Sequence, residues 1–213
     1  MGASSCLACN RAVVSKQRES VITAMAKRIT CSRVYPHVYR LLGKLPLCAG
    51  CLEASPFLER NLCRTCGRQM KEQGMCGDCQ TAPDDTLQYN RSLLRYEGWV
   101  RERISTFKYR GDERWADCFA LLLAIGYLRF FREERISCIT FVPIHEARLR
   151  ERGFNQAELL ATRLGALVKL PVEALLMRIR DTDKQSKQAG RHARLASMKD
   201  AFALQKHHGI GHG

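Results

Sequence analysis

The sequence predicts two parts: a small cysteine-rich domain held together by zinc, followed by an α/β domain with a mostly parallel sheet. Two observations carry this prediction. Eight of the eleven cysteines fall into four Cys-x-x-Cys pairs within the first 79 residues. Further along the chain, helical apolar patterns alternate with a β-branched apolar run, which is the element order of layered α/β domains. A length of 213 residues is sufficient for two such domains.

The four cysteine pairs predict two structural zinc sites. A Cys-x-x-Cys turn presents two thiolates to one side of a tetrahedral zinc ion, so two turns complete a site and leave no open position for water. Nine residues separate the third and fourth pairs, a span that a short hairpin can close, and 38 residues separate the first pair from the second. Sequential pairing is therefore expected, although spacing alone also allows the first pair to join the third and the second to join the fourth. The predicted ligands are Cys6, Cys9, Cys48, Cys51, Cys63, Cys66, Cys76 and Cys79.

The first residues and the hydropathy of the chain predict a cytoplasmic protein without membrane insertion. The N-terminal stretch has no apolar run after a basic segment, as a secretory signal would have. The longest apolar stretch, residues 119–128, is about half of the ~20 residues that span a bilayer. In a reducing compartment, clustered cysteines indicate metal binding rather than disulfides.

The charge of the chain predicts a polyanionic partner. The formal net charge is +14, and both parts contribute, with 12 basic and 7 acidic residues in 1–90 against 23 and 14 in 91–213. Four thiolates around each dication lower the total of the zinc-loaded chain to about +10. A polar stretch containing Pro83 follows the last cysteine pair and predicts a boundary near Asn90, so the expected domains are residues 1–90 and 91–213.

The elements of the second part follow from periodicity and capping residues. Helical spacing predicts a helix over residues 98–109, ended by Gly111, and Asp112 is the predicted N-cap of a largely apolar, buried helix over 113–131. The β-branched run 136–143 predicts a strand. An arginine-rich loop is expected over 144–154, and the next helix opens at Asn155, with Glu158 in a capping-box position.

The arginine-rich loop is a candidate phosphate site. Loops at the carboxyl ends of strands in open α/β sheets lie where ligands bind, and three arginines beside a helix N-terminus suit a phosphate group. An ordinary solvated basic loop is the alternative. The three arginines are Arg148, Arg150 and Arg152.

The chain resembles the ComF family, in which bacterial competence proteins combine N-terminal zinc fingers with a phosphoribosyltransferase-type domain. The resemblance rests on FVPIHEARLRERGFNQAELLA at 141–161, FKYRGD at 107–112, DKQSK at 183–187, DAF at 200–202 and the preceding cysteine pairs. It implies an α/β fold of the type I phosphoribosyltransferase kind, incomplete in this chain, behind a double zinc ribbon. The positions carried over from the motifs are Lys108, Arg110 and Gly111, then Arg152, Gly153, Phe154, Asn155 and Gln156, then Gln185, Arg191 or Arg194, and Phe202.

The lysine and arginines among these residues are hydrogen-bond donors suited to the phosphate oxygens of a diphosphate or of a DNA backbone, although solubility alone would also explain them. The predicted phosphate- or nucleic-acid-binding set is Lys108, Arg110, Arg148, Arg150, Arg152, Asn155, Gln156, Gln185, Arg191 and Arg194. Aromatic residues that lie near basic residues in the sequence, such as Tyr109, would stack on bases, or else belong to the core.

A departure from the transferase pattern argues against catalysis in this chain. Type I phosphoribosyltransferases hold phosphoribosyl pyrophosphate (PRPP) with two adjacent carboxylates after an apolar strand, followed by a Thr-Thr-Gly or similar loop. Adjacent acids such as Asp84-Asp85 and Glu133-Glu134 follow no such strand, and the chain contains no Thr-Gly or Ser-Gly dipeptide. The expectation is therefore a C-terminally truncated or frameshifted member with no catalytic residues, in which PRPP and magnesium binding are confined to full-length relatives.

Three functional hypotheses follow. The resemblance implies uptake or cytoplasmic handling of transforming single-stranded DNA, together with a helicase-like competence partner. The alternative is a PRPP-dependent phosphoribosyltransferase of nucleotide metabolism. A third hypothesis is a zinc-stabilised interaction module whose α/β part is a degenerate scaffold. Nothing in the sequence decides the oligomeric state.

Overall fold

The computed structural model describes residues 5–59, 61–81, 88–182, 193 and 196–205. Contacts divide the chain into two compact units, Met1–Arg135 and Ile136–Gly213. The first unit thus holds the cysteine-rich segment together with two long helices that follow it. The division of the chain into domains at residues 1–90 and 91–213 stays a prediction.

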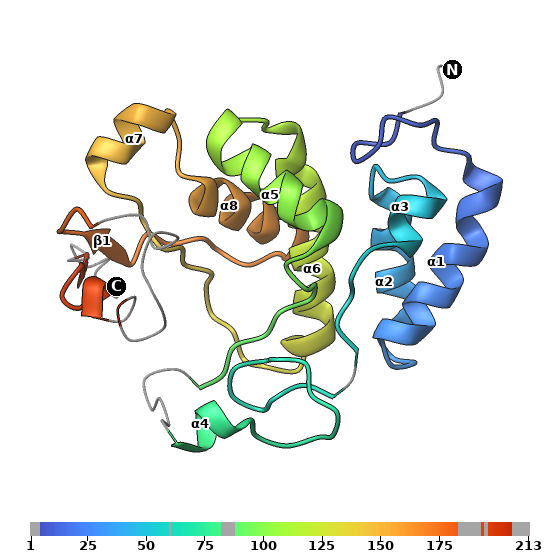
Figure 1. Cartoon of the computed structure of the whole chain (residues 1–213), viewed down its shortest axis with the longest axis horizontal. Coiled ribbons are helices and arrows are strands. Elements are labelled where there is room, and N and C mark those ends of the chain that lie inside the picture. The colour runs from blue at the N-terminus through green and yellow to red at the C-terminus, as the bar shows by residue number, and fades with distance from the viewer. Residues whose placement is uncertain (1–4, 60, 82–87, 183–192, 194–195, 206–213) are drawn as a thin grey trace, which may run out of the picture. The chain divides into compact units, whose positions relative to one another are not determined.

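Helices dominate the first unit (Figure 1). Helix α1 packs against α2 and α3, and α2 packs against α6. Val38 and Leu42 of α2 and Ile125 of α6 have no exposed surface and mark the centre of this core. The helices are α1 (Ser15–Ile29), α2 (Tyr35–Lys44), α3 (Ala49–Glu53), α4 (Gly77–Thr81), α5 (Gly98–Arg110) and α6 (Arg114–Phe130).

Helices α1 and α2 occupy the 38 residues between the first two cysteine pairs. In α1, Ile22, Met25 and Ile29 recur at helical spacing and are buried. Arg18 of α1 donates from Nη2 to three carbonyl oxygens at the end of α2, of which Leu45 is the nearest at 2.8 Å. Because the last carbonyls of a helix have no partner within it, this arginine completes the end of α2.

The predicted helices after residue 98 are confirmed as α5 and α6. Gly111 ends α5 with φ at 64°, the left-handed conformation that glycine adopts without steric cost. Trp115 of α6 is 1% exposed and stacks on Trp99 of α5 at a ring-centroid distance of 5.7 Å. The predicted N-cap at Asp112 is wrong: the cap position is Glu113, and Asp112 instead accepts from Nε and Nη2 of Arg114 at 2.8 and 2.9 Å, so both carboxylate oxygens are engaged.

The second unit contains helices α7 (Glu146–Arg152) and α8 (Gln156–Val168) and strands β1 (Leu176–Arg178) and β2 (Phe202–Leu204). The strands pair antiparallel, with Met177 opposite Ala203. The described residues thus form a two-stranded antiparallel sheet in place of the mostly parallel sheet expected from the sequence.

The predicted strand at 136–143 forms only one isolated parallel bridge, between Ile139 and Val172, within the part of the chain that the structure describes. Ile139 donates to the carbonyl of Pro171 at 2.8 Å, and Glu173 donates back to Ile139 at 2.9 Å. A strand extends into a ladder only where its neighbour offers both donors and acceptors. Pro171 has no N–H, which limits this pairing to a short stretch.

The predicted arginine-rich loop over 144–154 is wrong over its middle, because Glu146–Arg152 forms helix α7. His145 is the N-cap, and its Nδ1 accepts from the backbone N–H of Ala147 at 3.3 Å. Gly153, with φ at 79°, ends the helix in a left-handed cap. The segment between them consists mostly of residues with high helix propensity. This propensity was a signal for a helix, but the high charge of the segment suggested a loop instead.

Asn155 caps α8 as predicted, and its Oδ1 accepts from the N–H of Ala157 at 3.1 Å.

Replacing Asn155 with alanine is expected to lower the free energy of unfolding by about 1 kcal/mol, because the N–H of Ala157 then lies at a helix start without its acceptor. Serine at the same position supplies an oxygen and should preserve most of the stability. Urea denaturation followed by circular dichroism measures both variants, and equal losses in the two would contradict the capping role.

Candidate functional site

Two groups of four cysteines have the geometry of zinc centres. In each group the four Sγ atoms lie within 4.8 Å of one another. The Sγ atoms of Cys9 and Cys48 are 3.6 Å apart, and those of Cys66 and Cys76 are 3.7 Å apart. A tetrahedron with Zn–S bonds of about 2.3 Å has S···S edges of about 3.8 Å, so the thiols fit zinc. The sequential pairing is confirmed: the groups are Cys6, Cys9, Cys48 and Cys51, and Cys63, Cys66, Cys76 and Cys79.

The two centres share one local backbone arrangement. In both, the first cysteine donates its N–H to a carbonyl five residues later, Arg11 at 2.7 Å and Arg68 at 2.8 Å. The residue after the second cysteine has positive φ, 62° at Asn10 and 70° at Gly67. At Gly67 a Cβ would also lie 2.7 Å from the carbonyl oxygen of Asn90, so the close approach of that segment requires glycine.

The thiols are not equivalent before metal binds. The backbone N–H and the side chain of Arg11 lower the pKa of Cys9 to about 6. Burial acts to raise the pKa of Cys63, but backbone N–H groups, including that of Cys76 at 3.3 Å, outweigh it and lower the pKa to about 6. Burial raises the pKa of Cys79 to about 12. Because four thiolates cannot be packed together without a cation, zinc supplies the charge balance that both centres need.

Arginines that follow the cysteine region in sequence hold the segments around both centres in place. Arg103 of α5 donates from Nη2 to the carbonyl oxygen of Ala8, inside the first cysteine turn, at 2.8 Å. Arg91 donates from Nη1 to the carbonyl oxygen of Arg64, inside the third turn, at 2.8 Å. Residues 88–110 therefore help to hold the backbone around both zinc centres in place. The amino-acid composition alone does not reveal this contribution.

An arginine cluster lies in the second unit, where α7, β1 and the turn after β1 meet. Arg148 donates from Nη2 to the carbonyl oxygen of Thr182 at 3.3 Å, and its Nε lies 3.8 Å from Asp181. Arg178 of β1 donates from Nη2 to the hydroxyl of Thr182 at 2.5 Å. Burial, followed by the positive charge of Arg148, lowers the pKa of Arg178. His145 Nδ1 also lies 3.9 Å from Asp181. Asp181 thus lies within ion-pair distance of Arg148, and Arg178 is held beside them by Thr182.

Helix α7 separates its own arginines. Successive residues on a helix are rotated by about 100°, so Arg148 and Arg152 share a face and Arg150 points the other way. The side chain of Arg150 is 74% exposed, and its Nη2 lies 3.8 Å from Glu146. Arg152 donates to the side-chain oxygen of Gln156 at 3.5 Å. The three arginines therefore do not converge on one ligand.

The other predicted binding residues are spread over the chain. Lys108 and Arg110 lie exposed in the last turn of α5, in the first unit, with exposed Tyr109 between them. Asn155 and Gln156 are buried at the start of α8. Gln185, Arg191 and Arg194 lie outside the described residues. For all of these, a role in binding stays a prediction.

The residues Arg178, Asp181 and Thr182 were not predicted from the sequence. They come directly before the DKQSK motif, at the end of a stretch with alternating arginines, LMRIRD. That alternation places Arg178 and Arg180 on one face of an extended segment, which was the available signal.

A family model for the double zinc ribbon domain matches residues 29–80. This range contains all four cysteines of the second centre together with Cys48 and Cys51 of the first, while Cys6 and Cys9 precede it. The competence protein ComFC of Bacillus subtilis is 30% identical over 146 residues, which cover 66% of this chain and 58% of that protein. Competence protein F of Haemophilus influenzae is 25% identical over 175 residues, covering 74% of this chain and 76% of that protein. The chain thus spans less than two thirds of the length of the Bacillus protein.

No solved structure matches the chain, and the phosphoribosyltransferase-like fold stays a prediction. None of the helices in the described residues is long and apolar enough to cross a membrane. The two tetracysteine centres are structural zinc sites of a double zinc ribbon. These sites and the similarity to two competence proteins support the resemblance of the chain to the ComF family.

Proposed function

We propose that this protein assists the cytoplasmic handling of transforming single-stranded DNA, and that the arginine cluster around Arg148 and Arg178 binds the DNA backbone. The similarity to two competence proteins carries the first half of the proposal. The cluster supports the second half, because the guanidinium groups of Arg148 and Arg178 lie close together: burial, followed by the charge of Arg148, lowers the pKa of Arg178, while the carboxylate of Asp181 lies 3.8 Å from Arg148. A helicase-like competence partner would deliver or receive the strand.

The chemistry of the cluster suits a phosphate diester. A guanidinium group offers two parallel N–H donors that match two phosphate oxygens. The side chain of Arg148 is only 19% exposed, so its charge is less screened by water than that of an ordinary surface arginine. Asp181 is 50% exposed and can turn toward solvent when a phosphate replaces it beside Arg148.

Binding of an oligothymidylate to the zinc-loaded protein, followed by fluorescence anisotropy over a salt series, tests the proposal. The affinity is expected to fall as salt rises, because phosphate contacts release counterions. The double variant Arg148→Gln/Arg178→Gln should reduce the slope of log affinity against log salt by about one to two. Absence of binding at low salt would refute the proposal.

A matched control removes the same charge elsewhere. The double variant Arg101→Gln/Arg135→Gln changes two exposed arginines that lie outside the cluster and outside the predicted binding set. It should leave the salt slope close to that of the unmodified protein. Equal effects of the two double variants would mean that general charge, and not the cluster, binds DNA.

The transferase alternative has no additional support in the described residues. Glu134 accepts a hydrogen bond from the hydroxyl of Tyr89 at 2.8 Å and follows helix α6 rather than a strand. Asp84 and Asp85 lie outside the described residues. Magnesium-dependent binding of PRPP in a calorimeter would favour the transferase hypothesis over ours.

A further inference from the structure

A cavity of about 510 Å³ lies in the first unit, and its lining includes no zinc ligand and no residue of the arginine cluster. Its walls come from the end of α1, the turn into α2 and the end of α6. One part of the lining is apolar: Ile29, Val34, Leu128 and Phe130. A volume between about 300 and 1,000 Å³ is typical of small-molecule sites, and such sites combine an apolar wall with a few polar groups.

The polar part of the lining is strongly basic. Arg33, Arg129 and Arg132 face the cavity together with one acid, Glu133. The carboxyl ends of α1 and α6 add a partial charge of about −0.5 each. These charges leave the cavity with a surplus of about +1. The site therefore favours an anion.

Two of these arginines, Arg129 and Arg132, are held in place by hydrogen bonds to backbone carbonyl oxygens. Arg129 donates from Nη1 to the carbonyl oxygen of Leu58 and from Nη2 to that of Glu59, both at 2.6 Å. Its guanidinium carbon lies 4.6 Å from the centroid of the Phe130 ring. Arg132 donates from Nη1 to the carbonyl oxygen of Arg33 at 3.4 Å, which brings both arginines to the same edge. A flat group next to Phe130 and Arg129 would thus lie within reach of further cationic groups.

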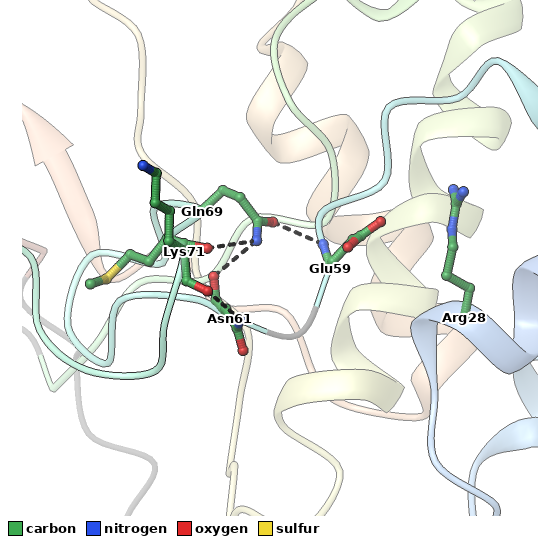
Figure 2. Close-up of a pocket in the computed structure, with 6 residues that line it drawn as sticks. Arg28, Glu59, Asn61, Gln69 and Lys71 are labelled. Carbon is green, nitrogen blue, oxygen red and sulfur yellow. Dashed lines mark hydrogen bonds between the residues drawn. The ribbon is translucent and has the colours of Figure 1, made fainter.

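A second cavity of the same unit, of about 550 Å³, differs in kind (Figure 2). Gln69 donates to the carbonyl oxygen of Asn61 at 3.0 Å and accepts from the N–H of Glu59 at 2.9 Å. Asn61 donates to the carbonyl oxygen of Lys71 at 2.7 Å. Its polar groups bind one another and stabilise the loop, so they are not arranged to receive a ligand. Arg28 stands apart from this network in Figure 2.

We propose that the cavity between the ends of α1 and α6 binds one nucleotide unit, with the phosphate on Arg33 and Arg132 and the base against Phe130 and Arg129. Arginine pairs well with phosphate, and aromatic rings and guanidinium planes are the groups on which bases stack. A free nucleotide and a nucleotide within a single strand share this chemistry. The site is separate from the arginine cluster of the proposed function.

Cys31 provides a probe, because it lines the cavity, is exposed and belongs to neither zinc group. The zinc-loaded protein is treated with the neutral reagent iodoacetamide, and alkylation is followed by mass spectrometry of peptides. Saturating thymidine monophosphate or oligothymidylate is expected to slow alkylation of Cys31 at least about tenfold. Cys138, in the second unit, is the internal reference. Burial raises the pKa of Cys118 to about 12, so this thiol stays unreactive.

Substitutions sharpen the test. Arg33→Gln/Arg132→Gln should weaken the protection by nucleotide at least about tenfold, because two charge-assisted contacts are lost. Arg40→Gln/Arg101→Gln removes the same charge from exposed positions outside the lining and should leave protection unchanged.

Each outcome decides the proposal. Protection by both ligands, or by the strand alone, supports it and identifies the source of the nucleotide. Equal protection by inorganic phosphate at the same concentration would overturn it, since the base would then play no part. If oligothymidylate binds by anisotropy yet neither ligand protects Cys31, the cavity proposal fails while the DNA-handling proposal stands. If free nucleotide protects Cys31 but oligothymidylate does not bind, the cavity proposal stands while the DNA-handling proposal fails.

Discussion

Replacing Cys63 with serine is expected to reduce the zinc content from two ions per chain to one and to unfold the segment around the second centre. Structural zinc contributes roughly 10 to 16 kcal/mol to the folding of small zinc domains. Cys63 is fully buried, and its Sγ also accepts from the N–H of Cys76 at 3.3 Å. A serine hydroxyl is a poor zinc ligand, so the remaining three thiolates lose most of their affinity.

Metal analysis by mass spectrometry and hydrogen exchange of residues 61–81 measure this effect. Cys31→Ser is the matched control, because Cys31 is an exposed thiol outside both groups, and two zinc ions should remain bound. Cys9→Ser should also lose one ion, but with increased exchange around the first centre instead. A Cys63→Ser protein that retains two zinc ions would contradict the assignment of the ligands.

Replacing Trp115 with alanine is expected to lower the free energy of unfolding by about 3 to 5 kcal/mol. Its ring is 1% exposed and lies 5.7 Å from the ring of Trp99 and 5.4 Å from that of Phe119. The guanidinium carbon of Arg103, which binds the first cysteine turn, lies 5.9 Å from the same ring. The substitution should therefore also increase the rate at which a chelator removes zinc from the first centre.

Urea denaturation and zinc release to a coloured chelator check both effects. Tyr96→Ala is the control, because Tyr96 is 62% exposed, and its loss should cost at most about 0.5 kcal/mol. Trp115→Phe preserves an aromatic ring and keeps the experiment informative if the alanine variant does not fold. A cost below about 1 kcal/mol for the alanine variant would show that this cluster is not a core.

The features that the sequence predicted correctly depend on short-range rules. Thiol spacing predicted both zinc groups, Gly111 predicted the end of α5, and Asn155 predicted the start of α8. Helices α1 and α2 were overlooked, although the spacing of Ile22, Met25 and Ile29 was a usable signal.

The features that were predicted wrongly depend on distant partners or on competing local interactions. The run 136–143 has the composition of a strand, but its ladder depends on a neighbour about 30 residues away, and Pro171 there cannot donate. In α7, high charge suggested a loop, while His145 and Gly153 at its two ends specify a helix. The arginine cluster required Arg148 and Arg178 to meet across the fold, which no local pattern reveals.

The helical insert between the first two cysteine pairs gives the two zinc centres different dependence on metal supply. Closing a flexible loop of 38 residues costs about 1.3 kcal/mol more conformational entropy than closing one of nine. Part of that entropy cost is recovered only when α1 and α2 pack. Zinc binding at the first centre is therefore coupled to the folding of the insert, whereas the loop of the second centre closes locally. Under zinc limitation we therefore expect the second centre to fill first, and α1 and α2 to become ordered together with the first centre.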